Sequence, residues 1–165
     1  MKNNLLLTLL FLFAIVSDQI SKYFITVNFN LYESKSLIGN FLYFHYIKNP
    51  GAAFGLTLGH PLFMLAITIL IVIILGYLFL KGNIFSDNML GKTAMVLVLG
   101  GAFGNLIDRV RFMEVVDFID MGIGTHRWPV YNLADVYVTI GMFILIYYFT
   151  FIESPGQNSK ADSSE

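Results

Sequence analysis

Cysteine is missing from all 165 residues, which excludes thiol catalysis, disulfides and cysteine-ligated zinc or iron–sulfur sites. Histidine is scarce, and His45, His60 and His126 lie far apart without the His-x-x-x-His spacing of a metal site, so we expect neither a metal nor another cofactor. Charged residues make up only 13% of the chain, whereas a soluble domain carries about a quarter. The net charge of −1 offers no electrostatic attraction to nucleic acid. These absences favour a membrane protein.

Long apolar runs take the place of the missing charge. Hydrophobic residues make up 56% of the chain, and the mean hydropathy is +0.70. A bilayer core of about 30 Å needs about 20 apolar residues per helix. Four runs meet this length: Leu5 to Val27, Pro61 to Leu80, Leu90 to Ile107 and Val130 to Ile152. The sequence therefore predicts an all-α membrane protein with four transmembrane helices, organised as one membrane-embedded domain over residues 1–153.

The first run could instead be a secretory signal peptide, since Met1-Lys2 precedes a short apolar stretch. No small-x-small cleavage pattern follows Val16, however, and the segment from Asp18 to Lys22 continues a helical pattern. We therefore expect this helix to be retained.

Two segments outside the apolar runs have a recognisable character. Leu37 to Ile47 is rich in β-branched and aromatic residues around a Gly-Asn turn signal, which predicts a small β-structure between the first two helices. Its aromatic side chains are expected at the membrane interface. Residues 154–165 contain mainly small and polar residues, so we expect a disordered tail there.

Polar residues near the helix ends are predicted to gather at one membrane face. Because consecutive spans alternate in direction, the carboxyl ends of the first and third helices share a face with the amino ends of the second and fourth. The unusual polar residues lie near those four ends: Asp18, Lys22, Asn49, Asn105, Asp108, Arg109, Asn132 and Asp135. Ionisable groups at membrane depth normally face the bundle interior or a water-filled cavity. We therefore expect one polar pocket that opens at one face.

Four acids are candidates for chemistry in this pocket: Asp108, Asp117, Asp120 and Asp135. In a chain without cysteine or a metal cluster, two carboxylates that share a proton are the obvious hydrolytic device. One acts as a base while the other is a protonated acid, because two like charges in close contact cannot both ionise easily. Spacing alone does not decide which two acids form the pair.

The chain resembles the lipoprotein signal peptidase family from about Leu5 to Phe151. Five blocks carry the resemblance, in this order: Asp18-Gln-Ile-Ser-Lys22, Asn49-Pro-Gly-Ala-Ala-Phe-Gly55, Gly100-Gly-Ala-Phe-Gly-Asn-Leu-Ile-Asp-Arg109, Val115-Val-Asp-Phe118 and Tyr131-Asn-Leu-Ala-Asp135. Each block alone is a weak signal, but five in the right order around four spans are specific.

The resemblance implies an aspartyl endopeptidase with Asp117 and Asp135 as its catalytic pair. It also implies a set of substrate-binding or structural pocket residues: Asp18, Lys22, Asn49, Gly51, Asn105, Arg109 and Asn132. The implied substrates are diacylglyceryl-modified prolipoproteins, cleaved on the amino side of the lipidated cysteine. The enzyme is expected to be a monomer among the lipids of the bacterial cytoplasmic membrane, with its active site and β-structure on the outer side and its tail in the cytoplasm.

The distribution of basic residues does not support this orientation. The positive-inside rule places more lysine and arginine in the cytoplasm. With the pocket outside, the cytoplasmic set is Lys2, Lys81, Lys92 and Lys160, and the outer set is Lys22, Lys35, Lys48, Arg109, Arg111 and Arg127. The expected orientation therefore comes from the resemblance and not from composition.

Several of these residues also have a purely structural interpretation. Asp18 and Lys22, four apart on one helix face, could form only an ion pair, and Asp108 is expected to pair with a neighbouring base. Asp120 is expected to be a solvated loop acid. The small residues Gly100, Gly101 and Gly104 are expected to allow close helix packing rather than to form a phosphate loop.

Two other functions fit a membrane protein with buried carboxylates. A small ion- or proton-coupled transporter uses them as proton relays, but its polar residues should be spread through the depth of the bilayer. A non-catalytic assembly factor would use a polar cluster only to hold helices together. This alternative predicts that a substitution such as Asp117→Asn has no effect on peptidase activity.

Overall fold

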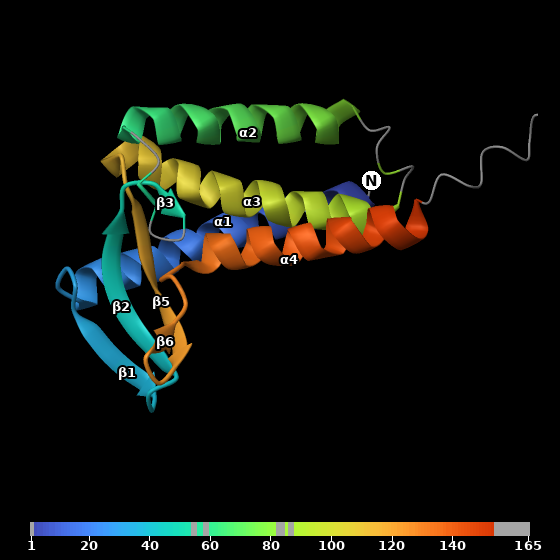
Figure 1. Cartoon of the computed structure of the whole chain (residues 1–165). Coiled ribbons are helices and arrows are strands. Elements are labelled where there is room, and N and C mark those ends of the chain that lie inside the picture. The colour runs from blue at the N-terminus through green and yellow to red at the C-terminus, as the bar shows by residue number, and fades with distance from the viewer. Residues whose placement is uncertain (1, 54–55, 58–59, 82–84, 86–87, 154–165) are drawn as a thin grey trace, which may run out of the picture.

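The computed structural model describes residues 2–53, 56–57, 60–81, 85 and 88–153. It contains four long helices that run side by side, with a small antiparallel sheet at one end of the bundle (Figure 1). The predicted tail, residues 154–165, lies outside the described residues.

The four predicted membrane helices are confirmed. Their bounds are α1 Lys2–Asn28, α2 Pro61–Lys81, α3 Met89–Phe112 and α4 Leu133–Tyr147, and a π-helical turn, η1, continues α4 over Tyr148–Ile152. Each is long and apolar enough to cross a membrane. Three predicted ends differ from the structure by three residues or more, since the first helix begins at Lys2 instead of Leu5, the third ends at Phe112 instead of Ile107, and the fourth begins at Leu133 instead of Val130. The third helix continues past Ile107 with Asp108 buried and paired with Lys22, and the fourth begins at Leu133 because Asn132 caps it.

Helix α3 is the central element of the bundle, in contact with α1, α2 and α4. Two of its small residues permit this packing. A Cβ atom on Gly101 would collide with the Ala134 carbonyl oxygen, and one on Gly104 would lie 2.6 Å from Asp18 Oδ2. The prediction that these glycines allow close packing is therefore confirmed.

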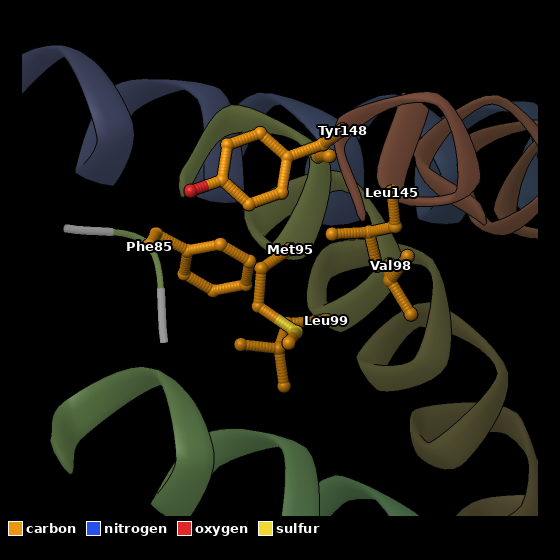
Figure 2. Close-up of a cluster of buried hydrophobic side chains, with 7 residues drawn as sticks. Phe85, Met95, Val98, Leu99, Leu145 and Tyr148 are labelled. Carbon is orange, nitrogen blue, oxygen red and sulfur yellow. The ribbon is translucent and has the colours of Figure 1, made fainter. Parts of the chain in front are cut away.

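The apolar core of the bundle, whose side chains are drawn in Figure 2, lies at the end of the bundle remote from the sheet in Figure 1. It joins α3 to the last turns of α4 and to the segment before α3, through Phe85, Ala94, Met95, Val98, Leu99, Leu145 and Tyr148. The polar residues occupy the opposite end of the bundle, next to the sheet, so the two kinds of interior are separated along the helix axes.

The main sheet has the strand order β1-β2-β5-β6 and is antiparallel throughout. Its strands are β1 Ser34–Ile38, β2 Leu42–Asn49, β5 Val115–Ile123 and β6 His126–Arg127; β3 Ala52–Ala53 and β4 Leu56–Thr57 form a separate pair. The predicted hairpin is β1–β2, with its turn at Gly39-Asn40. The prediction was incomplete, however, because β5 and β6 follow α3 and were not expected.

Strand β5 connects the sheet to the helices and fixes which way its acid points. Val116 and Phe118 pack with Ile25 of α1 and Tyr46 of β2 in a second buried cluster. Because successive side chains of a strand point to opposite faces, Asp117 lies on the other face of β5. That face borders the cavity described next.

Candidate active site

The predicted convergence of polar residues is present in the structure. Hydrogen bonds link α1, α3, α4, β2 and β5 at the sheet end of the bundle, where α1 and α3 end and α4 begins. The alternating direction of the four helices therefore brings these side chains into one region, and the contacts between individual atoms depend on how the helices and the sheet pack together.

Asp117 is buried on β5 and is held by two amide side chains. Its Oδ2 accepts a hydrogen bond of 2.8 Å from Asn49 Nδ2, and its Oδ1 accepts one of 2.6 Å from Asn132 Nδ2. The pKa of the Asp117 carboxyl is raised from its ordinary 3.8 to about 7, first because burial disfavours the charged form and second because the Asp135 charge is close. The carboxyl can thus hold a proton near neutral pH.

Asp135 lies in the first turn of α4 and takes part in the cap of that helix. Its Oδ2 accepts the Asn132 backbone N–H at 3.1 Å, while its own N–H donates to Asn132 Oδ1 at 3.1 Å, which completes a capping box. Its Oδ1 accepts a hydrogen bond of 2.8 Å from Asn105 Nδ2. Local helix capping and one contact with α3 therefore determine the position of this carboxylate.

Asn132 is the residue that joins the two acids. Its side chain is fully buried. Besides Asp117 Oδ1, its Nδ2 group lies 3.1 Å from Asn105 Oδ1 and 3.4 Å from the Val116 carbonyl oxygen. One asparagine thus caps α4, donates to Asp117 and accepts from the backbone of Asp135.

A cavity of about 640 Å³ opens beside the two carboxylates. Of the residues named from the sequence, six line it: Asn49, Gly51, Asn105, Arg109, Asp117 and Asp135. The Arg109 charge interacts with both Asp117 and Asp135 across this space. Asp18, Lys22 and Asn132 are buried behind the wall and are not among the lining residues.

Gly51 has a conformation that this wall requires. Its φ angle of +122° is one that side-chain-bearing residues rarely adopt, and a Cβ atom there would collide with Met64 of α2. Its N–H donates to Asn49 Oδ1 at 2.9 Å. The asparagine amide is thereby oriented so that its Nδ2 group faces Asp117.

The rest of the lining was not predicted from the sequence. It is mostly apolar and comes from the segment before α4, from α4 itself, from one position on α2 and from two on β5: Met64, Val115, Met121, Trp128, Pro129, Val130, Tyr131, Val136, Thr139 and Ile140. The Trp-Pro-Val-Tyr run just before the fourth helix was the available signal, since aromatic residues next to a helix end are suited to an interfacial wall.

Two expectations about the other acids had different outcomes. Asp108 does pair with a base, because Lys22 Nζ lies 3.0 Å from its Oδ2. Asp120 is not a solvated loop acid. It lies within β5 and pairs with Arg127 at 2.8 Å. The loop assignment was wrong because the sequence did not reveal β5. Within the described part of the chain, no three His, Asp or Glu side chains form a potential metal site.

The chain is similar in sequence to lipoprotein signal peptidases. The family model described as "Signal peptidase (SPase) II" matches residues 10–151. The chain is 45% identical to the lipoprotein signal peptidase of Moorella thermoacetica over 139 residues, which are 83% of this chain and 87% of that relative. It is 39% identical to the lipoprotein signal peptidase of Staphylococcus aureus strain MRSA252 over 138 residues, 84% of this chain and 83% of that relative.

Solved structures agree with the sequence relatives. One, described as a bacterial membrane enzyme, is 36% identical, covers 93% of both chains and superposes with a TM-score of 0.80. A second, with the same description, is 37% identical, covers 88% of this chain and 93% of that one, and has a TM-score of 0.76. These matches favour a protease over a transporter or an assembly factor. The chain belongs to the signal peptidase II family and is a multi-pass membrane protease.

Proposed function

We propose that this protein removes signal peptides from diacylglyceryl-modified prolipoproteins, with Asp117 and Asp135 as the catalytic pair. The names of its relatives support the substrate class. The observation that carries the mechanism is the pair of carboxylates beside one cavity, of which Asp117 has a pKa raised to about 7. One protonated and one ionised carboxyl is the state in which such a pair can activate water.

In this mechanism Asp135 is the base and Asp117 is the acid. A water molecule attacks the scissile carbonyl carbon, one of its protons passes to Asp135, and the proton of Asp117 passes to the carbonyl oxygen. The tetrahedral diol then collapses: one hydroxyl group returns its proton to Asp117 as the C=O bond reforms, the C–N bond breaks, and the leaving nitrogen takes the proton held by Asp135. Arg109, which lines the same cavity, is suited to orient a substrate carbonyl.

The shape of the cavity supports a substrate that arrives from the bilayer. Its lining includes Met64 on α2 and continues along α4 to Val136, Thr139 and Ile140. An acyl-anchored cysteine could lie against this apolar side while its amino-side peptide bond reaches the carboxylates. We propose that the enzyme cleaves this peptide bond, on the amino side of the lipidated cysteine. We also propose that it acts as a monomer.

The decisive experiment is a gel-shift assay on a purified lipidated precursor. Asp117→Asn and Asp135→Asn should each lower cleavage by at least ~10²-fold, because each removes a carboxyl that the pair requires. Asp120→Asn is the matched control, since it makes the same change on the same strand in a residue paired with Arg127. Near-normal turnover by either of the first two variants would eliminate the assignment.

Lipid recognition has its own test in the same assay. An unlipidated precursor with an identical peptide sequence should be a much poorer substrate, because it lacks the acyl chains that hold the scissile bond at the headgroup level. Equal cleavage of the two precursors would contradict this part of the proposal.

The proposed orientation has the site on the outer face of the cytoplasmic membrane and both termini in the cytoplasm. The sheet and the start of α1 lie at opposite ends of the bundle, which supports opposite sides of the bilayer (Figure 1). In intact cells, a membrane-impermeant thiol reagent should label Ser36→Cys on β1 and not Ser159→Cys. The reverse pattern would overturn the orientation.

A further inference from the structure

A cluster of three buried charges lies behind the cavity wall, and we call it the Lys22 cluster: Asp18, Lys22 and Asp108. Their exposed fractions are 0%, 3% and 2%. Lys22 Nζ lies 2.8 Å from Asp18 Oδ2, 3.0 Å from Asp108 Oδ2 and 2.9 Å from Asn105 Oδ1. An ammonium group has three N–H donors, so all three are used within the protein and none points to substrate.

The two carboxylates of the cluster hold the backbone next to the two proposed catalytic acids. Asp18 Oδ1 accepts the Ala134 N–H at 2.9 Å, and Ala134 immediately precedes Asp135. Asp108 Oδ2 accepts the Val116 N–H at 3.1 Å, and Val116 immediately precedes Asp117. The start of α4 and the start of β5 are thus attached to the same lysine, each through one carboxylate.

The third ligand of Lys22 extends the connection to the acids themselves. Asn105 accepts from Lys22 through Oδ1 and donates from Nδ2 to Asp135 Oδ1. The same Oδ1 also accepts from Asn132, which donates to Asp117. Along these hydrogen bonds, only Asn105 lies between Lys22 and Asp135, and Asn105 and Asn132 lie between Lys22 and Asp117.

Stability alone is a poor explanation for such a cluster. Removing three charges from water is costly, and well-packed apolar residues often hold helices together as well or better. This protein has such a core at the other end of the bundle, around Phe85 and Met95. Helix α3 also has a glycine at position 104, where a Cβ atom would lie 2.6 Å from Asp18 Oδ2. The absence of a side chain at position 104 thus leaves space for the buried carboxylate of Asp18.

We propose that Lys22 is a positioning residue for peptide hydrolysis: through Asp18 and Asp108 it ties the start of α4 to the start of β5, and so holds Asp135 and Asp117 in register. The proposal rests on the catalytic pair proposed above. The contacts of Asp18 with Ala134 and of Asp108 with Val116 should depend on each other, because both carboxylates pair with the single ammonium group of Lys22.

The charge of Lys22 also acts on the acid that is proposed to carry the proton. The charged groups around Asp117 are Asp135 on α4, Arg109 on α3 and Lys22 on α1, and the amides of Asn49 and Asn132 complete its surroundings. Lys22 lowers the pKa of Asp117. Without this charge the pKa of Asp117 should rise, and the alkaline limb of the activity profile should move to higher pH.

The test compares Lys22→Met, which keeps the aliphatic stem but removes the charge, with Lys22→Arg, which keeps the charge. For each variant, kcat, KM and the pH profile are measured on the lipidated precursor, per folded molecule in the monodisperse fraction. Lys22→Met should lower kcat by about 10²-fold, the cost of misplacing reacting groups by about 1 Å, with KM nearly unchanged and the alkaline limb shifted upward. Lys22→Arg should keep the alkaline limb in place.

Lys48→Met is the matched control, because Lys48 is exposed at the same end of the protein and pairs loosely with Glu114 at 3.9 Å. It should match the wild type in kcat and pH profile. A Lys22→Met enzyme with normal kcat per folded molecule and an unshifted profile would overturn the positioning role. Cleavage by Asp117→Asn would instead refute the catalytic pair, so the two failures are distinguishable.

If Lys22→Met does not fold, Asp18→Asn and Asp108→Asn replace it, since each keeps the shape of the side chain. Each should lower kcat, and the double variant should lose less than the product of the two single losses, because both attachments depend on one lysine. If the loss of kcat in the double variant equals the product of the two single losses, the two contacts act independently, and the proposal is overturned.

Discussion

Asn132→Ser is a sharp test of the site because it separates helix capping from contact with Asp117. Serine caps a helix about as well as asparagine, so the start of α4 should keep its acceptor for the Asp135 N–H. The shorter side chain has no amide, however, and the 2.6 Å hydrogen bond from Asn132 Nδ2 to Asp117 Oδ1 disappears. Asp117 Oδ1 then loses its amide donor, and the carboxyl keeps only the hydrogen bond from Asn49 to Oδ2.

The expected magnitude follows from the strength of that hydrogen bond. Leaving a buried acceptor without its donor costs about 1–3 kcal/mol, and about 1.4 kcal/mol corresponds to a factor of ten. If the bond holds Asp117 in its reactive position, kcat should fall by about fivefold to 150-fold. The alkaline limb should also move upward, because the Asn132 amide lowers the pKa of Asp117.

The assay is cleavage of the lipidated precursor, with kcat expressed per folded molecule. Asn88→Ser is the matched control: Asn88 caps α3 at the far end of the bundle, where its side chain accepts from Leu90 and Gly91. This variant should differ from the wild type in unfolding free energy by only a few tenths of a kcal/mol and should cleave normally. Equal kcat for Asn132→Ser and Asn88→Ser would refute the role given to the amide.

Three further predictions concern stability and inhibition. Because the pKa of Asp117 is raised in the folded protein, its contribution to stability is fully present below pH about 4 and is lost as the pH rises to about 7. The unfolding free energy of the wild type should therefore fall by up to about 4 kcal/mol across this window. The Asp117→Asn variant should not show that fall. Gly104→Ala, which would contact Asp18 Oδ2, should lower the thermal midpoint by several degrees in detergent, whereas Gly76→Ala on α2, where a Cβ meets nothing within 4 Å, should not. Chelators and thiol-blocking reagents should leave cleavage intact, while compounds with a hydroxyl or tetrahedral centre should inhibit it; activity lost on chelation and restored by zinc would contradict the aspartyl mechanism.

The number and type of the helices could be predicted from the sequence, because transmembrane helices depend on a local property. About 20 apolar residues in a row suffice to span the bilayer and satisfy their own backbone hydrogen bonds. The alternation of four spans then required Asp18, Asn105 and Asp135 to share one end of the bundle. The β1–β2 hairpin, with its Gly39-Asn40 turn, could also be predicted, because the turn and the residues on both sides of it form a local pattern in the sequence.

The identity of the acid pair could not be obtained from spacing. Asp117 and Asp120 are three residues apart on β5, yet one is held by Asn49 and Asn132 beside the cavity and the other by Arg127 away from it. The difference arises because residues an odd number apart on a strand point to opposite faces. The partners that meet each face, Asn49 and Asn132 on one and Arg127 on the other, come from segments that the sequence did not place beside β5. Only the resemblance to a known family selected Asp117 beforehand.

The chemistry of the site depends on contacts that no local pattern contains. Asn132 was predicted from the sequence only as a polar pocket residue three positions before Asp135. In the structure it caps α4, and its hydrogen bond to Asp117 exists only because β5 lies against the start of α4. Lys22 and Asp18 read as an ion pair within one helix, while their bonds to Asn105 and Ala134 come from the packing of α1 against α3 and α4. Apolar periodicity sets helices and strands residue by residue, whereas a hydrogen-bonded network depends on angstrom-scale distances between elements that are remote in the chain.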